Sequence, residues 1–302
     1  MLHTLEEMAF FTKTAKPRLA CEVTPFTVIA ARANRDGTGV DLYTGRKLSG
    51  NVVNPSLTAD NILNPEALRD AITGALASLA GRNRDVIAIL PDAAVRVMLL
   101  DFDTLPEKRN DADPLIRFRL RKSLPFDVDS AALSFQSRHE NGGVKVLAAV
   151  VPSAVLPGYE AAFRNAGYEP GVVLSSTLAT LSTVEAHTPT LLVKADGPFI
   201  TMAIVDANEI LLYRTLDTPT SSSDVAEAVY PSIVFYEDNY SSKLQRILLA
   251  GTANLAEIAS ALYAQTEIRP QEVQTSLAVG EALSGEPLAP SSIAGLAGVL
   301  VN

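Results

Sequence analysis

The sequence predicts an α/β protein made of two domains. Short apolar runs of strand character alternate with amphipathic helical segments along most of the chain. The pattern of several strands followed by a helix begins again near residue 190. The length of 302 residues also suits two cores, because single cores stop growing near about 250 to 300 residues. We therefore expect an N-terminal tail over 1–16, a first domain over 17–189 and a second domain over 190–302.

Strands open the first domain. An apolar strand is predicted over 18–33, and residues 42–48 together with Val52 and Val53 indicate further strands. The turn Asp36-Gly37-Thr38-Gly39 separates them with residues typical of a hairpin. A helix is predicted over 65–80, where Pro65 suits the first turn. A buried strand over 85–90 follows, and this β-β-β-α-β order is typical of one half of an actin-like, ribonuclease-H-like fold.

An inserted region is predicted from about 95 to 167. Its expected elements are a strand over 95–102, a helix near 113–123, strands near 131–138 and over 144–151, and a helix over 153–166. Leu124-Pro125-Phe126 ends the first of these helices, since proline cannot donate to the helical ladder. The turn Asn141-Gly142-Gly143 joins the two later strands. A helix over 175–186 then returns the chain to the first domain.

The second domain repeats the arrangement. A β-meander is expected over 190–216, then a Ser/Thr/Pro linker over 217–223 and a helix over 224–242. The remaining elements are a strand over 246–250, a helix over 254–262 and a closing helix over 293–300. The alternative is a plain α/β domain with a hairpin insertion. Only the order of the elements favours the two-domain interpretation over it.

Charge and composition exclude several classes of function. A net charge of -9 and a pI of about 4.9 argue against nucleic acid or anionic lipid as the main partner. His3, His139 and His187 lie far apart, so no metal site is expected. Cys21 sits alone among apolar residues, as in a reducing compartment. No segment has the length of a membrane span, so we expect a cytoplasmic protein without direct membrane insertion.

Three segments of the insertion resemble a known family. They are the strand over 95–102, the helix start Leu105-Pro106-Glu107 and the helix stop Leu124-Pro125-Phe126, followed by a strand at 132–136. Their order resembles the inserted subdomain of the PilM family, the actin-like proteins of type IV pilus assembly. The resemblance covers about 17–302 and implies an actin-like, two-domain fold with a small subdomain inserted in domain 1.

The nucleotide motifs of such proteins are altered here. Where the family has I-D-I-G-S-S-S-I-K, this sequence reads Cys21 to Ile29, so that Glu22 replaces the aspartate and Thr24 the glycine. Pro25 removes an N–H that a phosphate would need. The second and third motifs read Val193-Lys194-Ala195-Asp196 and Ala250-Gly251-Thr252-Ala253. The degenerate site positions are therefore Glu22, Thr24, Pro25, Thr27, Lys194, Asp196, Gly251 and Thr252.

These changes imply a protein that is not an enzyme. We expect no catalytic residue, no metal and no cofactor, with retained ATP and Mg²⁺ as the alternative. Relatives also carry a long segment between the β-meander and the next strand, where this chain has only about 217–245. The upper lobe of the second domain is therefore expected to be small.

The resemblance also implies a partner. In the PilM family the N-terminal cytoplasmic peptide of a PilN-type membrane protein lies between the first subdomain and the insertion. The candidate contacts here are Arg117, Leu120, Arg121, Leu124 and Phe126. Leu120 and Leu124 equally fit the core of the insertion, and the basic cluster 117–122 equally fits a solvated helix face.

The resulting hypothesis is a non-catalytic cytoplasmic scaffold, held at the inner membrane by PilN-type and other pilus platform proteins. One alternative is a GspL-like component of type II secretion. Such chains continue into a transmembrane helix, whereas the sequence here ends at Asn302. A second alternative is an actin-like protein that still binds ATP.

Overall fold

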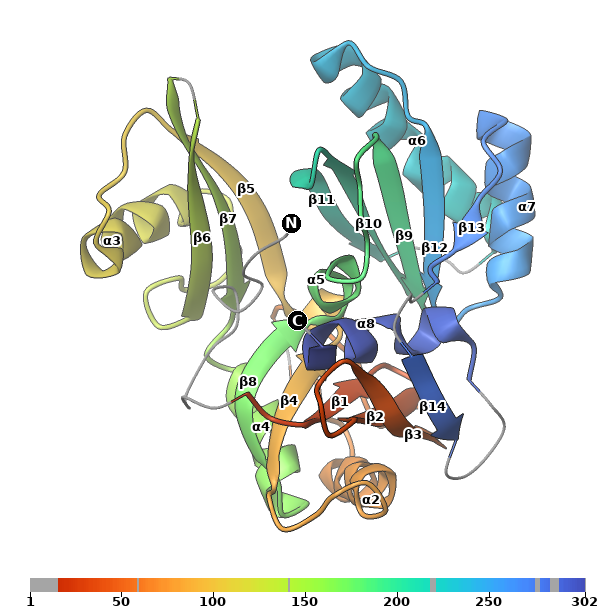
Figure 1. Cartoon of the computed structure of the whole chain (residues 1–302). Helices are drawn as coiled ribbons and strands as arrows, with labels where there is room; N and C mark the ends of the chain where they lie inside the picture. The colour runs from red at the N-terminus through yellow and green to blue at the C-terminus, as the bar shows by residue number, and fades with distance from the viewer. Residues whose placement is uncertain are drawn as a thin grey trace.

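The computed structural model describes residues 16–58, 60–140, 142–217, 221–274, 278–282 and 288–301. These residues form two large mixed sheets and a third, smaller sheet, with helices packed against them (Figure 1). The α/β class predicted from the sequence is confirmed. Most of the expected N-terminal tail, Asn141 and part of the linker over 217–223 lie outside the described residues.

The first large sheet has the strand order β14-β3-β2-β1-β4-β8. Its strands are β1 (Leu19–Val23), β2 (Thr27–Ala33), β3 (Gly39–Lys47), β4 (Asp85–Leu90), β8 (Glu169–Ser175) and β14 (Ala278–Ala282). The central strand β1 pairs antiparallel with β2 and parallel with β4. It therefore lies in the middle of the sheet and is buried along its whole length.

Helices cover both faces of this sheet. They are α2 (Pro65–Leu76), α4 (Leu156–Asn165), α5 (Ser176–Leu181) and α8 (Pro290–Val301). Side chains alternate along a strand, so Cys21 of β1 joins the core beneath α2 and α4, whereas Ala20 joins the core beneath α8. The same alternation turns Glu22 toward the α8 side.

The second large sheet has the order β11-β10-β9-β12-β13. Its strands are β9 (Thr190–Asp196), β10 (Phe199–Asp206), β11 (Glu209–Asp217), β12 (Arg246–Gly251) and β13 (Gln271–Glu272). The helices α6 (Ser222–Tyr240) and α7 (Leu255–Thr266) bury their apolar residues against it. The core beneath α2 continues into this sheet through Leu192 and Leu248, so the two large sheets share buried contacts.

The third sheet is inserted after β4. A short 3-10 helix, η1 (Asp92–Ala94), leads into β5 (Arg96–Phe102), and the order β5-β7-β6 is completed by β6 (Ala132–Glu140) and β7 (Gly143–Val151). The helix α3 (Arg109–Leu120) covers one face of the sheet and shares a core with it. The helix α4, expected in the inserted region, instead packs against α2 and β8.

Several elements differ from their predicted form. The single strand predicted over 18–33 is the hairpin β1–β2, because Pro25 and the side chain of Thr24 form a turn. Val53 makes only an isolated bridge with Ile62. The strand β8 was not predicted, since its Pro170 and Gly171 are typical of a turn. The helix predicted over 175–186 is the shorter α5.

The C-terminal segment returns to the first sheet. β14 pairs parallel with β3, and α8 packs against α5 and β2 as well as β12. Sequence patterns placed these residues in the second domain. They are shared between the two large sheets, because α8 is buried on most of its surface and needs both sheets to cover it. Within the described residues, no helix is both long and apolar enough to cross a membrane.

Candidate functional site

Two hairpin turns face each other where the large sheets meet. One joins β1 to β2 and the other joins β9 to β10. Gly197 in the second turn has a φ of +65°, and an added Cβ there would lie 2.3 Å from a ring carbon of Phe26. Phe26 of the first turn therefore rests directly on the second turn.

The first turn uses its own polar groups. Thr24 N–H donates to the carbonyl of Thr27 over 2.8 Å. The Thr24 hydroxyl oxygen accepts from Thr27 N–H at 3.0 Å and from Phe26 N–H at 3.3 Å. Pro25 has no N–H to offer. This turn therefore has no free backbone donor to bind a phosphate.

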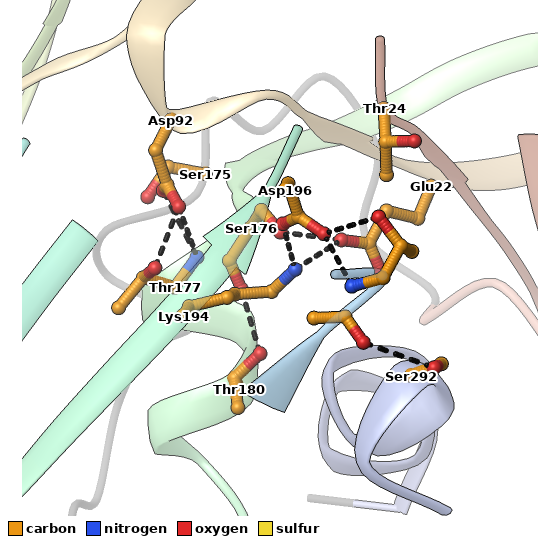
Figure 2. A network of polar contacts seen from close by, with 12 residues as sticks. Glu22, Thr24, Asp92, Ser175, Ser176, Thr177, Thr180, Lys194, Asp196 and Ser292 are labelled. Atoms are coloured by element: carbon orange, nitrogen blue, oxygen red, sulfur yellow. Dashed lines mark hydrogen bonds and ion pairs between the residues drawn. The ribbon is translucent and has the colours of Figure 1, made fainter. Parts of the chain in front are cut away.

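Between the two turns lies a buried ionic network (Figure 2). The Lys194 ammonium donates to Glu22 Oε1 at 3.1 Å and also to Asp196, and the Ser176 hydroxyl donates to the same oxygen of Glu22. Asp196 Oδ1 accepts from Thr252 N–H at 3.0 Å and from its hydroxyl at 3.1 Å. The network joins positions from all three degenerate motifs.

The charges of this network depend on one another. Burial tends to lower the pKa of Lys194, but the carboxylates of Asp196, Glu22 and Asp92 outweigh it and raise that pKa above its ordinary value. Burial raises the pKa of Glu22, against the opposing effect of Lys194. Lys194 is therefore a cation at neutral pH, held by carboxylates of its own chain.

Gly251 has a structural reason to be glycine. Its φ is +112°, and an added Cβ would lie 2.2 Å from the carbonyl oxygen of Ala195. Only glycine fits this close approach of β12 to β9. The single glycine retained in the third motif is thus required by packing.

Asp92 forms a second buried network, which sequence reasoning missed. Its carboxylate accepts from Thr177 N–H at 2.9 Å, from the Thr177 hydroxyl at 2.5 Å and from the Tyr213 hydroxyl at 3.0 Å. Burial raises the pKa of Asp92. The sequence signal was an aspartate directly after Pro91, at the end of a buried strand.

The space left between the turns is very small. A cavity of about 10 Å³ remains there. A cavity of this size holds at most one water molecule. Its lining residues include Thr24, Pro25, Asp92, Lys194, Asp196 and Phe199. These residues do not fit a triphosphate with Mg²⁺, since Lys194 and Phe26 occupy the space between the turns.

The predicted partner contacts on α3 and directly after it divide into two groups. Leu120 is fully buried and Leu124 is nearly so, both in the core of the insertion. This corrects their interpretation as groove residues, because they leave no surface for a partner. Arg117 pairs with Asp113 at 2.6 Å and donates to backbone carbonyls after α3. Arg121 is half exposed, and Phe126 is half buried against the same core.

A much larger hollow lies elsewhere on the surface. It is a groove of about 1210 Å³ between the third sheet and the β11–α6 side of the second sheet. We call it the β5–β11 groove, and its lining includes Arg96, Leu99, Leu147, Glu209, Tyr213 and Phe235. None of the five predicted partner contacts lines it.

No protein-family model matches the chain, and no curated protein matches it. Solved structures do. A PilM–PilN type IV pilus biogenesis complex aligns with a TM-score of 0.71 at 16% identity, over 85% of this chain and 89% of that one. The chain has the actin-like fold.

Two further structures share this fold. The cytoplasmic domain of EpsL, an inner-membrane component of the type II secretion system of Vibrio cholerae, aligns with a TM-score of 0.52 at 12% identity, covering 93% of this chain and 92% of that one. A Bacteroides thetaiotaomicron protein of unknown function with an actin-like ATPase fold gives 0.52 at 7% identity, with 93% and 94% covered. The predicted actin-like class with a small inserted sheet is confirmed.

Proposed function

We propose that this protein is a non-catalytic scaffold of a type IV pilus assembly platform. It acts in the cytoplasm and is held at the inner membrane by a PilN-type partner and by other platform proteins. The observation that carries the proposal is the Glu22–Lys194–Asp196 network, which fills the space between the two hairpins with the protein's own charges. A site without room for phosphates cannot hydrolyse a nucleotide, so in this proposal the protein acts by binding other proteins.

The likeness in fold favours a pilus partner over a secretion partner. The PilM–PilN complex aligns with a TM-score of 0.71, against 0.52 for the secretion component EpsL. A GspL-like role in type II secretion is therefore the second candidate.

Nucleotide binding is the first test. Calorimetry with ATP and Mg²⁺ should give no saturable heat, and the melting temperature should not change, because only a ligand that binds the folded state raises its stability. The variant Phe26→Ala serves as a comparison, since it removes the ring that rests on Gly197. It should still fail to bind while Lys194 is present. Saturable binding to the unchanged protein would support the ATP-binding alternative.

Partner binding is the second test. A fluorescent peptide with the cytoplasmic N-terminal sequence of a single-span, PilN-type membrane protein from the same genome should bind saturably in anisotropy measurements. The same peptide in scrambled order is the control. If the segment binds no better than its scrambled copy, the scaffold proposal fails.

A further inference from the structure

One wall of the β5–β11 groove is a sheet face that other elements cover only in part, since Val97 and Ala149 on it are buried in the core beneath α2. In the third sheet, α3 covers the face that carries Leu100 and Val146. Side chains alternate along strands, so Leu99 and Leu147 point to the opposite face, where they pair across β5 and β7. Leu99 is 37% exposed. Leu147 packs in part against that core, whereas the exposed part of Leu99 is open to a ligand.

The groove also lies between two free strand edges. β5 is the edge of the third sheet, and β11 is the edge of the second large sheet. They lie side by side (Figure 1), yet no backbone hydrogen bond joins them within the described part of the chain. Edge strands carry unpaired N–H and C=O groups that readily accept an added strand. The backbone therefore offers an extended peptide its own hydrogen bonds here.

A cation in the groove lacks a partner. Nε of Arg96 is buried without a hydrogen bond, and Arg96 forms no ion pair with any described residue. Four other charged residues on the walls form ion pairs, Arg138 with Glu209 and Lys145 with Glu140 at 2.9 Å, whereas Asp101 and Arg214 are exposed to solvent. An unsatisfied buried donor costs free energy, which a carboxylate or carbonyl in the groove would recover.

We propose that the β5–β11 groove binds an extended, largely apolar segment of a partner protein and that Arg96 receives a carboxylate of that segment. The apolar residues of the segment pack on Leu99 and Leu147, and its backbone pairs with an open edge of β5 or β11. The inference rests on the proposed scaffold function. It adds to that function a binding site away from α3 and the chemistry of the segment that binds there. The groove exceeds the roughly 300 to 1,000 Å³ of small-molecule pockets, as a peptide requires.

A random library of short peptides displayed on phage, selected on the intact protein, tests this. The enriched peptides should alternate apolar residues and carry one aspartate or glutamate. Their affinity, measured by anisotropy with synthetic copies, should fall at least ~10-fold in Arg96→Gln, as expected when a charged hydrogen bond is lost. Leu99→Lys should weaken binding to a similar degree because it places a charge on the apolar wall.

The matched control is Arg119→Gln, an exposed arginine on α3 that lines no part of the groove. It makes the same chemical change in the same inserted region and should leave affinity unchanged. Melting temperatures of all three variants show that each is folded.

Two results would overturn the inference: no enriched peptide, or enriched peptides whose affinity neither Arg96→Gln nor Leu99→Lys lowers. A change of oligomeric state in Leu99→Lys, with peptide affinity unchanged, would assign the groove to a second copy and also overturn it. The scaffold proposal is judged separately, by binding of the single-span protein's segment to the unchanged protein.

Discussion

Lys194 in β9 donates a hydrogen bond to Glu22 in β1 over 3.1 Å, although 172 residues separate them in the sequence. The two side chains are 4% and 2% exposed. They come from different large sheets, so this ion pair ties the two sheets together between the two hairpin turns. A buried pair is costly to break, because removing one partner leaves the other charged group uncompensated.

We expect Lys194→Met to lower the free energy of unfolding by about 3–5 kcal/mol at neutral pH. The change leaves Glu22 and Asp196 facing each other without a cation between them. Urea denaturation measures the effect. Lys243→Met is the control, since Lys243 is exposed and the same truncation should have little effect there.

A second replacement should restore much of that loss. In the double variant Glu22→Gln, Lys194→Met, one of the two facing carboxylates is gone, while Asp196 keeps its hydrogen bonds from Thr252. Replacing both members of a buried ion pair is often nearly neutral. A double variant no more stable than Lys194→Met alone would contradict an electrostatic origin.

Asp92 should make stability depend on pH in the acid range. Burial raises the pKa of its carboxyl group, so the folded protein holds that proton more tightly than the unfolded chain. The free energy of unfolding therefore falls as pH rises from the ordinary aspartate pKa through the raised folded value. Lys194 plays no part in this window, because its pKa is raised and its contribution is lost only in strong alkali.

The variant Asp92→Asn removes this titration. Unfolding midpoints in urea between about pH 4 and pH 7 should fall less steeply with rising pH than in the unchanged protein. Burial also raises the pKa of Glu22, so the titration of Glu22 changes the free energy of unfolding in the same direction in both proteins. Parallel pH profiles would show that Asp92 titrates as it does in the unfolded chain.

Local sequence signals predicted the elements whose ends are marked by residues that start or stop regular structure, such as proline and asparagine. The strand predicted over 85–90 is β4, because an unbroken apolar run ends at Pro91. The helix predicted from Pro65 is α2, where Asn64 accepts from Ala67 N–H and Pro65 opens the first turn. In contrast, β8 begins Glu-Pro-Gly, which is typical of a turn. Tertiary pairing with β4 overrides that preference.

The candidate site could be predicted only as a set of positions. The sequence showed that Glu22, Lys194 and Thr252 stand where a nucleotide site has other residues. It could not show that Glu22 and Lys194 bind each other, since no local pattern links residues so distant. Asp92 follows Pro91 and Arg96 lies in the strand segment of the family resemblance, but neither pattern showed their contacts, because these depend on groups from other elements.

Phe26 and Gly197 should show strong coupling in a double-mutant cycle. Gly197→Ala places a methyl group against the Phe26 ring and also strains a backbone with a φ of +65°. Phe26→Ala removes only the first of these effects, so the double variant should be more stable than the sum of the two single changes predicts. Gly81→Ala is the control, because nothing lies within 4 Å of an added Cβ there. Strict additivity would mean that the two turns do not touch in solution.

The last prediction separates the core of the insertion from its surface at two adjacent positions where α3 ends. Leu120 is fully buried against β6 and β7, so Leu120→Ala should cost about 2–5 kcal/mol in unfolding free energy. Arg121 is 53% exposed and pairs with the equally exposed Asp129, a type of pair that adds little stability.

Arg121→Glu should therefore leave the melting temperature nearly unchanged. If the end of α3 contacts the partner, as the resemblance implies, the same variant should weaken binding of the single-span protein's segment at least ~10-fold, because it reverses a contacting charge. Arg119→Glu makes an equal change in net charge on the same helix and should keep the affinity. Equal weakening by both variants would indicate a long-range effect of charge, and full binding by both would place the segment away from α3.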